Sequence, residues 1–304
     1  MGADQGPIVQ SALLCGELVR LRKASGLTQK QVAAALDWSP SKLIRMEGGR
    51  SSISQVDLDA LLGKYDVTSG NLRERLHALN RGAKEPRWWD RYKDGVSQIY
   101  LSYVGFEAGA SFIRQFQSGF LPDLLQTAEY AKAVTVDSVD PARAAAIVDL
   151  RLRRQSELAQ RDSRPHQYYV VDEAVIRRHV RITRSPDIVL DQLRQIADTA
   201  ERDDLVTVRV LPLDVGAQRG LYSPFTLLEF DGGLSDLLYI DAGRGEFTSM
   251  VKGTDPRVGQ YRRDFELLLD DALSVEESIE LIRSVVAGIS SAGPGADRSA
   301  RVRK

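Results

Sequence analysis

Residues 26–50, with the sequence GLTQKQVAAALDWSPSKLIRMEGGR, decide the fold of the first part of the chain. Thr28 followed three residues later by Gln31 is the pattern of a capping box, which starts a helix. Ser39 followed by Pro40 predicts a second helix start, because a proline in the first turn loses no hydrogen bond. Between the two helices, Asp37 occupies a turn position at which we expect a positive φ. The stretch therefore predicts two short helices joined by a tight turn.

The second of these helices has one apolar and one polar side. Leu43 and Met46, three residues apart, are its expected buried pair, which turns Ser41, Lys42, Ile44 and Arg45 outward. A helix of this kind can enter the major groove of DNA, where arginine pairs with guanine and an apolar side chain contacts a thymine methyl group. The candidate DNA-binding residues are Thr28, Gln29, Ser39, Ser41, Lys42, Ile44, Arg45 and Arg50. The alternative is a small all-α domain with a solvated polar face.

The same stretch resembles the Cro/repressor-like (XRE-family) helix-turn-helix proteins, over residues 13–67. The matching residues are Gly26-Leu27-Thr28-Gln29, Ala33, Leu36, Ser39, Ser41-Lys42-Leu43, Arg45, Glu47 and Gly49-Arg50. The resemblance implies that Gln29, Ser41, Lys42, Arg45 and Arg50 contact DNA. Because Gln29 starts its helix and Arg50 lies just past the second helix, we expect these two to hold phosphates. The chain departs from the family pattern at Asp37, at Ile44 and at residues 51–53, where a basic stretch is common. The last departure weakens one phosphate contact, so we expect modest affinity or dependence on dimerisation.

Composition indicates a two-domain globular protein. The chain has 304 residues, of which 43% are hydrophobic and 27% charged, and its formal net charge is −1. Residues 1–83 contain 11 basic and 8 acidic residues, a net charge of +3 that suits the part proposed to meet phosphate. A single cysteine, Cys15, excludes an internal disulfide and fits a reducing compartment. With no membrane-length apolar run and no secretory signal, we expect a cytoplasmic protein without membrane contact.

The expected organisation is an all-α, five-helix domain over residues 1–82 and a linker over 83–87. An α+β domain with a mixed or antiparallel sheet follows over 88–290, and then a disordered basic tail over 291–304. Residues 1–10 look unstructured. The expected helices are 12–25, 28–36, 40–48, 54–65, 69–81, 125–134, 141–160, 186–202, 256–272 and 275–287. The expected strands are 111–117, 167–171, 206–211, 225–230, 237–240 and 247–251.

The second domain resembles the carboxy-terminal domain of actinomycete, WhiJ-like transcriptional regulators over residues 90–285. The most specific match is Leu121-Pro122-Asp123-Leu124-Leu125-Gln126-Thr127-Ala128-Glu129-Tyr130-Ala131, supported by Arg151-Leu152-Arg153-Arg154-Gln155. Asp123 stands where glycine is commoner. Such regulators often sit beside a gene for a small partner protein, an antitoxin-like arrangement. The resemblance does not identify a ligand for this domain.

Nothing in the sequence indicates catalysis, a metal or a cofactor. The three histidines, His77, His166 and His179, fall in different elements and lack metal-ligand spacing with Cys15 or with a carboxylate. The nucleophile-elbow and phosphate-loop patterns are absent. We therefore expect a protein that is not an enzyme, and we assign Cys15 a packing role.

Two groups of residues have competing interpretations. The aromatic stretch contains Trp88, Trp89, Tyr92, Tyr100 and Tyr103. Core and interdomain packing is the favoured reading, and the alternative is a ligand pocket or partner surface. For the arginines of 151–154, a solvated helix face is favoured over an anion site.

Together these patterns predict a sequence-specific, DNA-binding transcriptional regulator that binds double-stranded DNA as a homodimer. The second domain would dimerise and sense either a small-molecule effector or a small protein encoded beside it. The alternative function is an antitoxin-like interaction module that neutralises a small partner protein and binds DNA only for autoregulation.

Overall fold

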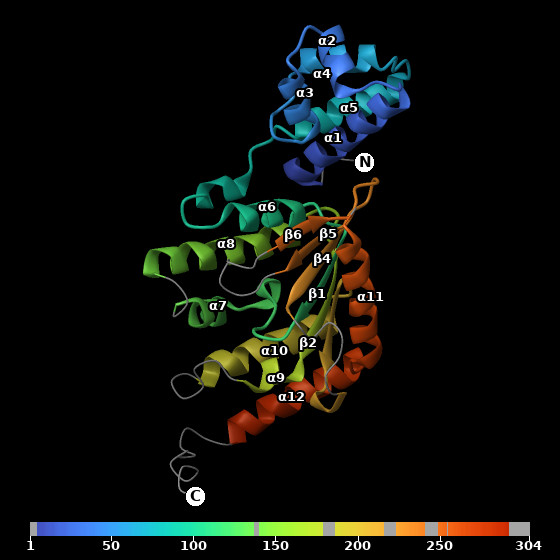
Figure 1. Ribbon diagram of the computed structural model, residues 1–304. Helices are drawn as coiled ribbons and strands as arrows, with labels where there is room; N and C mark the ends of the chain where they lie inside the picture. Colours follow the sequence, from blue (N-terminus) through green and yellow to red (C-terminus); the bar gives the residue numbers. More distant parts are fainter. Residues whose placement is uncertain are drawn as a thin grey trace, which may run out of the picture. The chain divides into compact units, whose positions relative to one another are not determined.

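The computed structural model describes residues 5–136, 140–178, 186–215, 223–240, 249–253 and 255–291 (Figure 1). Contacts divide the chain into two units. The first gathers residues 1–91, 101–110 and 230–235, and the second gathers 92–100, 111–229 and 236–304. The first unit contains a helical region and the second a mixed sheet with helices, which confirms the predicted fold class. The expected basic tail from residue 292 onward, and His179, lie outside the described residues.

Five helices form the amino-terminal region (blue to cyan in Figure 1). They are α1 (Gly6–Ala24), α2 (Gln29–Ala35), α3 (Pro40–Glu47), α4 (Gln55–Lys64) and α5 (Gly70–Gly82). Each of the last four begins after a residue whose hydroxyl oxygen accepts a backbone N–H of the first turn. These caps are Thr28, Ser39, Ser54 and Ser69. Local polar groups therefore define where the helices start.

The turn between α2 and α3 has the predicted backbone. Asp37 adopts a φ of +53°, and Gly26, which ends the turn before α2, adopts +66°. The Trp38 N–H donates to the Ala33 carbonyl oxygen at 2.8 Å and closes the turn. Asp is one of the few residues other than glycine that tolerate this region, so the turn forms without a glycine.

The core of the helical region is apolar and closely packed. Leu18, Val32, Leu43 and Leu58 have no exposed surface, and they come from four different helices. Ala33 is also fully buried, which is consistent with a small side chain where two helices cross closely. This core holds α3 by its apolar side and leaves its other side to solvent.

The expectation that residues 1–10 are unstructured is wrong from residue 6 onward, because α1 begins at Gly6. Val9 is fully buried, and Ile8 packs so near Gly105 that a Cβ there would lie 2.2 Å from it. Gly105 belongs to α6 (Gln98–Glu107), a helix that the sequence did not predict and whose residues from 101 onward belong to the first unit. Helix α1 is thus extended by packing against residues almost a hundred positions away.

The second unit is built on a six-stranded sheet in the order β3-β2-β1-β4-β5-β6. The strands are β1 (Phe112–Gln117), β2 (His166–Asp172), β3 (Val206–Leu211), β4 (Phe225–Glu229), β5 (Leu237–Ile240) and β6 (Ser249–Lys252). Neighbours among β1, β2 and β3 run parallel, whereas β4, β5 and β6 continue the sheet antiparallel. The helices are α7 (Ala128–Thr135), α8 (Pro141–Ala159), α9 (Glu173–Arg177), α10 (Pro186–Arg202), α11 (Pro256–Asp271) and α12 (Val275–Ser291).

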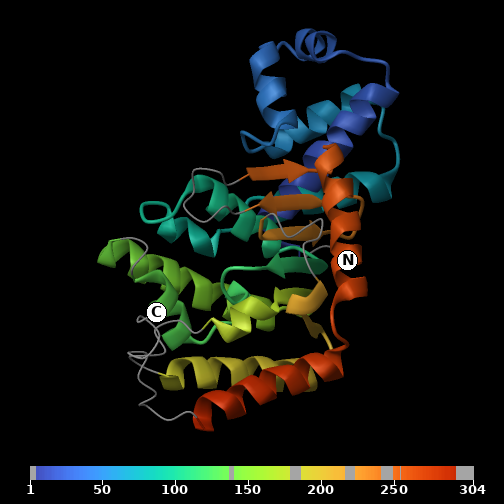
Figure 2. The same ribbon diagram turned by 60° about the horizontal axis from the view of Figure 1, so that its bottom comes forward.

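Helices cover both faces of this sheet. Tyr169 and Val171 of β2 point to a core shared with α10 and α12, whereas Val170 points to a core shared with α11. Figure 1 shows α11 on one side of the strands, and Figure 2 shows α10 and α12 side by side. Because both faces of the sheet are buried, β2 carries apolar side chains on both sides.

The helix expected over 125–134 begins later, at Ala128. A short 3-10 turn occupies Asp123–Leu125, and the Thr127 hydroxyl then accepts the Tyr130 N–H at 3.1 Å as the true cap. The short helix α9 was not predicted from the sequence, because five residues are too few to show a helical period.

Thr28→Ala should destabilise α2 locally. The substitution removes the hydroxyl that accepts the Gln31 N–H, for which the expected cost is about 1 kcal/mol, and leaves the bond from the residue 28 backbone N–H to the Gln31 side chain. Amide hydrogen exchange over residues 29–35, followed by mass spectrometry, should accelerate about fivefold. Thr28→Ser retains the hydroxyl and serves as the control. Equal exchange in both variants and the wild type would show that the cap contributes nothing.

Candidate nucleic-acid interface

Helix α3 presents a mixed polar and apolar face to solvent. Ser39 caps it through a bond from the Lys42 N–H, and Pro40 occupies its first turn. Leu43 and Met46 are buried, as predicted. The side chains of Ser41, Ile44 and Arg45 are exposed, as is Arg50 just beyond the helix. The combination of guanidinium, hydroxyl and branched apolar groups on one face suits the edges of base pairs.

The Glu47 carboxylate ties the end of α3 to two other helices. Arg22, in the last turn of α1, donates from Nε to Oε1 at 2.6 Å and from Nη2 to Oε2 at 3.0 Å. Gln29, the first residue of α2, donates from Nε2 to Oε2 at 2.7 Å. The Glu47 side chain is only 4% exposed, and its hydrogen bond raises the pKa of the Arg22 guanidinium above its ordinary value. A paired fork of this kind defines orientation as well as distance.

Gln29 therefore has a different contact from the expected one. Its amide was predicted to hold a phosphate, but in the structure one of its N–H groups is directed at Glu47. Arg22 and Glu47 were not predicted as site residues. A signal was available: a carboxylate at the end of a helix opposes the helix dipole, so it needs a partner.

Lys42 is also engaged within the protein. Its Nζ donates to Asp57 Oδ1 of α4 at 2.6 Å and lies 4.0 Å from the centre of the Trp38 ring. Burial alone would raise the pKa of Asp57, but bonds from Lys42 and Ser54 outweigh it and the pKa lies below its usual value. This lysine thus joins α3 to α4, and only its remaining N–H groups can meet a phosphate.

The hydroxyl groups of Thr28 and Ser39 also form hydrogen bonds within the protein. Thr28 Oγ1 accepts the Gln31 N–H, and Ser39 Oγ accepts the Lys42 N–H. By contrast, Arg45 and Arg50 form no ion pair with any residue in the described ranges. Lys30, exposed at the start of α2, is a third cation of this kind and was not among the expected residues. The groups available to a ligand are therefore Ser41, Ile44, these cations and the remaining N–H groups of Lys42.

The aromatic residues proposed as a ligand or partner surface are placed as follows. Trp89, Tyr92 and Tyr103 are 2%, 5% and 3% exposed, while Trp88 and Tyr100 are half-buried. The Tyr92 hydroxyl donates to Asp149 at 2.5 Å within the second unit. In the first unit, the Tyr103 hydroxyl donates to Glu107 at 2.7 Å. At least three of the five are thus packing residues in this conformation.

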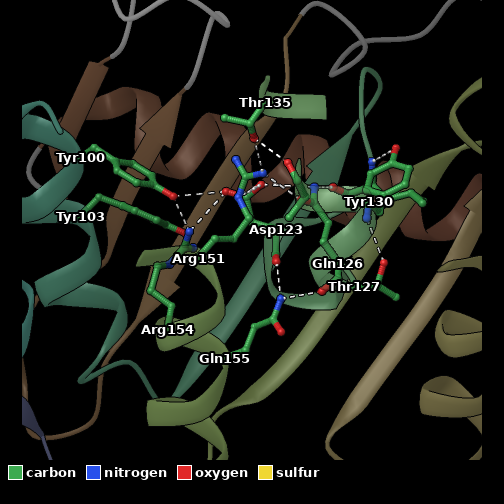
Figure 3. A network of polar contacts seen from close by, with 12 residues as sticks. Tyr100, Tyr103, Asp123, Gln126, Thr127, Tyr130, Thr135, Arg151, Arg154 and Gln155 are labelled. Atoms are coloured by element: carbon green, nitrogen blue, oxygen red, sulfur yellow. Dashed lines mark hydrogen bonds and ion pairs between the residues drawn. The ribbon is translucent and has the colours of Figure 1, made fainter. Parts of the chain in front are cut away.

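The arginines of α8 are not a solvated face, and that expectation is wrong for two of them. Arg154 is 2% exposed and lies 3.2 Å from Asp123 Oδ2, while Arg151 Nε lies 3.1 Å from Asp123 Oδ1 (Figure 3). Arg153 is the exposed one and pairs with Glu157 along the helix. Burial alone would raise the pKa of Asp123, but the two arginines outweigh it and hold the pKa below its usual value.

This network also holds the loop before α7 (Figure 3). Gln155 donates to the carbonyl oxygens of Asp123 and Gln126 at 2.8 and 2.9 Å. Arg151 donates to Gln126 Oε1 at 2.8 Å, and Tyr100 donates its hydroxyl to Asp123 at 3.2 Å. The polar residues of two separate sequence stretches thus bond to one another, and the buried Arg151 Nε has the Asp123 carboxylate nearby but no hydrogen bond.

Within the described ranges, no three histidine, cysteine or acidic side chains are grouped as a metal would need. His77 Nε2 lies 3.0 Å from Asp59 Oδ1. None of the helices that the structure describes is both long and apolar enough to cross a bilayer.

Two known domain families match the chain, one in its amino-terminal part and one in its carboxy-terminal part. A helix-turn-helix domain matches residues 14–76, which include α2, α3 and the turn between them. A domain of unknown function, DUF5753, matches residues 100–284. Neither a curated protein nor a solved structure matches the chain.

The second match covers more than half of the 304 residues and includes the Asp123 network. The chain therefore belongs to the family defined by the DUF5753 domain, and it carries a helix-turn-helix domain ahead of it.

Proposed function

We propose that this protein is a sequence-specific, DNA-binding transcriptional regulator, and that the exposed face of α3 reads base edges in the major groove. The observation that carries the proposal is the division of polar groups around α3. Glu47, Gln29 and Lys42 bond internally and hold the helix, while Ser41, Ile44 and Arg45 are exposed on it. A rigid helix with free recognition groups is what direct readout requires.

The role of the second unit is also a proposal. The helical region has a small excess of positive charge, so two copies on two half-sites would bind more tightly than one. We propose that the second unit dimerises the protein and responds to a small partner protein or a small-molecule effector. Exposed Phe120, Leu213 and Leu267 provide apolar surface in this unit for such contacts.

Genome-wide recovery of DNA bound by the purified protein tests the proposal as a whole. A recovered palindrome would give both the operator and the half-site spacing. Recovery of fragments without a shared motif would reject sequence-specific binding. Sedimentation with and without the operator duplex would then test dimerisation.

Arg45→Ala should weaken binding to the recovered operator by about 1–3 kcal/mol and relax selectivity at one base pair. The physical reason is the loss of a bidentate contact with a guanine edge. Fluorescence anisotropy on the operator and on single-base variants measures both effects. Arg75→Ala removes an exposed arginine from α5 and is the matched control. An equal loss on operator and random DNA would reassign Arg45 to the phosphate backbone.

Arg50→Ala should weaken binding to all sequences alike. Loss of one phosphate contact should reduce the slope of log K against log salt concentration by about 0.9. The measurement is a salt titration on a random duplex, with Arg75→Ala again as the control. A slope equal to that of the wild type would mean that Arg50 touches no phosphate.

Glu47→Gln tests whether the Glu47 carboxylate positions α3 or affects DNA binding only through its negative charge. Removing an acidic group near DNA should by itself strengthen binding, but the loss of the Arg22 pair should misplace α3. We expect operator binding to weaken by about 1–2 kcal/mol with an unchanged salt slope. Glu17→Gln, which disrupts an exposed pair with Arg20 on α1, is the control. Tighter binding by the Glu47 variant would show that this carboxylate does not position the helix.

A further inference from the structure

A cavity of about 230 Å³ lies within the first unit. Its walls come from α1, from the loop that follows α3 and from the chain that leaves α5. Three of its lining residues are cations, namely Arg50, Lys84 and Arg87, and none is acidic. Ser51 and Ser52 add two hydroxyl groups. The cavity is therefore positively charged and rich in hydrogen-bond donors.

The three cations have no counter-ion among the described residues. None of them forms an ion pair with a carboxylate among the residues that the structure describes. In the same unit, Arg22 and Lys42 are paired with Glu47 and Asp57. All three residues are exposed, so water solvates their charges when the cavity is empty, and an anion placed among them would be attracted by all three.

Asn80 adds a neutral hydrogen-bonding group to the wall of the cavity. This residue lines the cavity and is only 4% exposed. None of the hydrogen bonds described in the structure uses its side-chain amide, and the amide is not among the sealed polar atoms that lack a partner. The amide therefore remains able to donate to a group inside the cavity.

We propose that this cavity binds a phosphate group. Arginine and lysine supply the charge, and the Asn80 amide and the serine hydroxyls supply neutral donors to the remaining oxygens. The same group can come from the backbone of a DNA duplex or from a free phosphorylated small molecule.

Arg50 connects this cavity with DNA recognition. It lies three residues beyond the end of α3 and lines the cavity. A free phosphate compound that engages Arg50 removes a cation from the DNA-binding surface, so DNA and the compound weaken each other's binding by the same factor. This coupling rests on the proposed DNA-binding function, whereas occupation of the cavity by phosphate does not.

The test uses the full-length double variant Lys84→Gln/Arg87→Gln, which leaves Arg50 in place. The control is Lys64→Gln/Arg75→Gln, which removes the same charge from residues of the helical region outside the cavity. Circular dichroism checks that each variant is folded. Calorimetric titration with inorganic phosphate at constant ionic strength measures the free-anion arm. A salt titration on a random duplex measures the DNA arm.

For a free ligand, the wild type and the control should bind phosphate saturably, and Lys84→Gln/Arg87→Gln should bind it at least tenfold more weakly. For a duplex phosphate, the salt slope of the cavity variant should fall by about 0.9 relative to the control. Either result supports the proposal and identifies the source. The proposal is overturned if the cavity variant and the control agree in both measurements. Failure of the wild type to bind any duplex would refute the proposed function but leave the phosphate titration to decide the cavity.

Discussion

The orientation of α3 depends on one buried carboxylate. The negative charge of Glu47 is unfavourable at this position for two reasons. It opposes the dipole at the carboxyl end of its helix, and it would repel DNA phosphate. The structure offsets both with two bonds from Arg22 and one from Gln29. These residues come from three helices, so one charged group sets the relative placement of α1, α2 and α3. The recognition surface that we propose exists only while this arrangement is intact.

Polar residues around α3 divide into those that build the helix-turn-helix and those that remain free. Thr28 and Ser39 cap helices, and Lys42 links α3 to α4 through Asp57. A resemblance in sequence cannot separate these roles, since a side chain that contacts DNA and one that supports the contact occupy neighbouring positions. Geometry separates them, because a hydrogen-bond donor that is already directed at a carboxylate is only partly available to a phosphate.

In the second unit, two separate stretches of the matched DUF5753 domain meet in space. Asp123 and Gln126 belong to the first stretch, and Arg151, Arg154 and Gln155 belong to the second. Their contacts are internal, so these residues hold the loop before α7 against α8. Asp123, which stands where glycine is commoner, supplies the counter-charge for two arginines. A motif of this kind therefore describes the scaffold of the domain and does not identify a ligand.

The sequence by itself determined the caps, the left-handed turn at Asp37 and most strands, because those signals act between residues only a few positions apart. Tertiary structure decided the early start of α1, the existence of α6, the internal bonds of Gln29 and Lys42 and the burial of the α8 arginines. The cavity near Arg50 belongs with them. Each of these features joins residues from separate elements. No local sequence pattern indicates that such residues will meet. Their contacts depend on the packing of elements that are distant in the sequence.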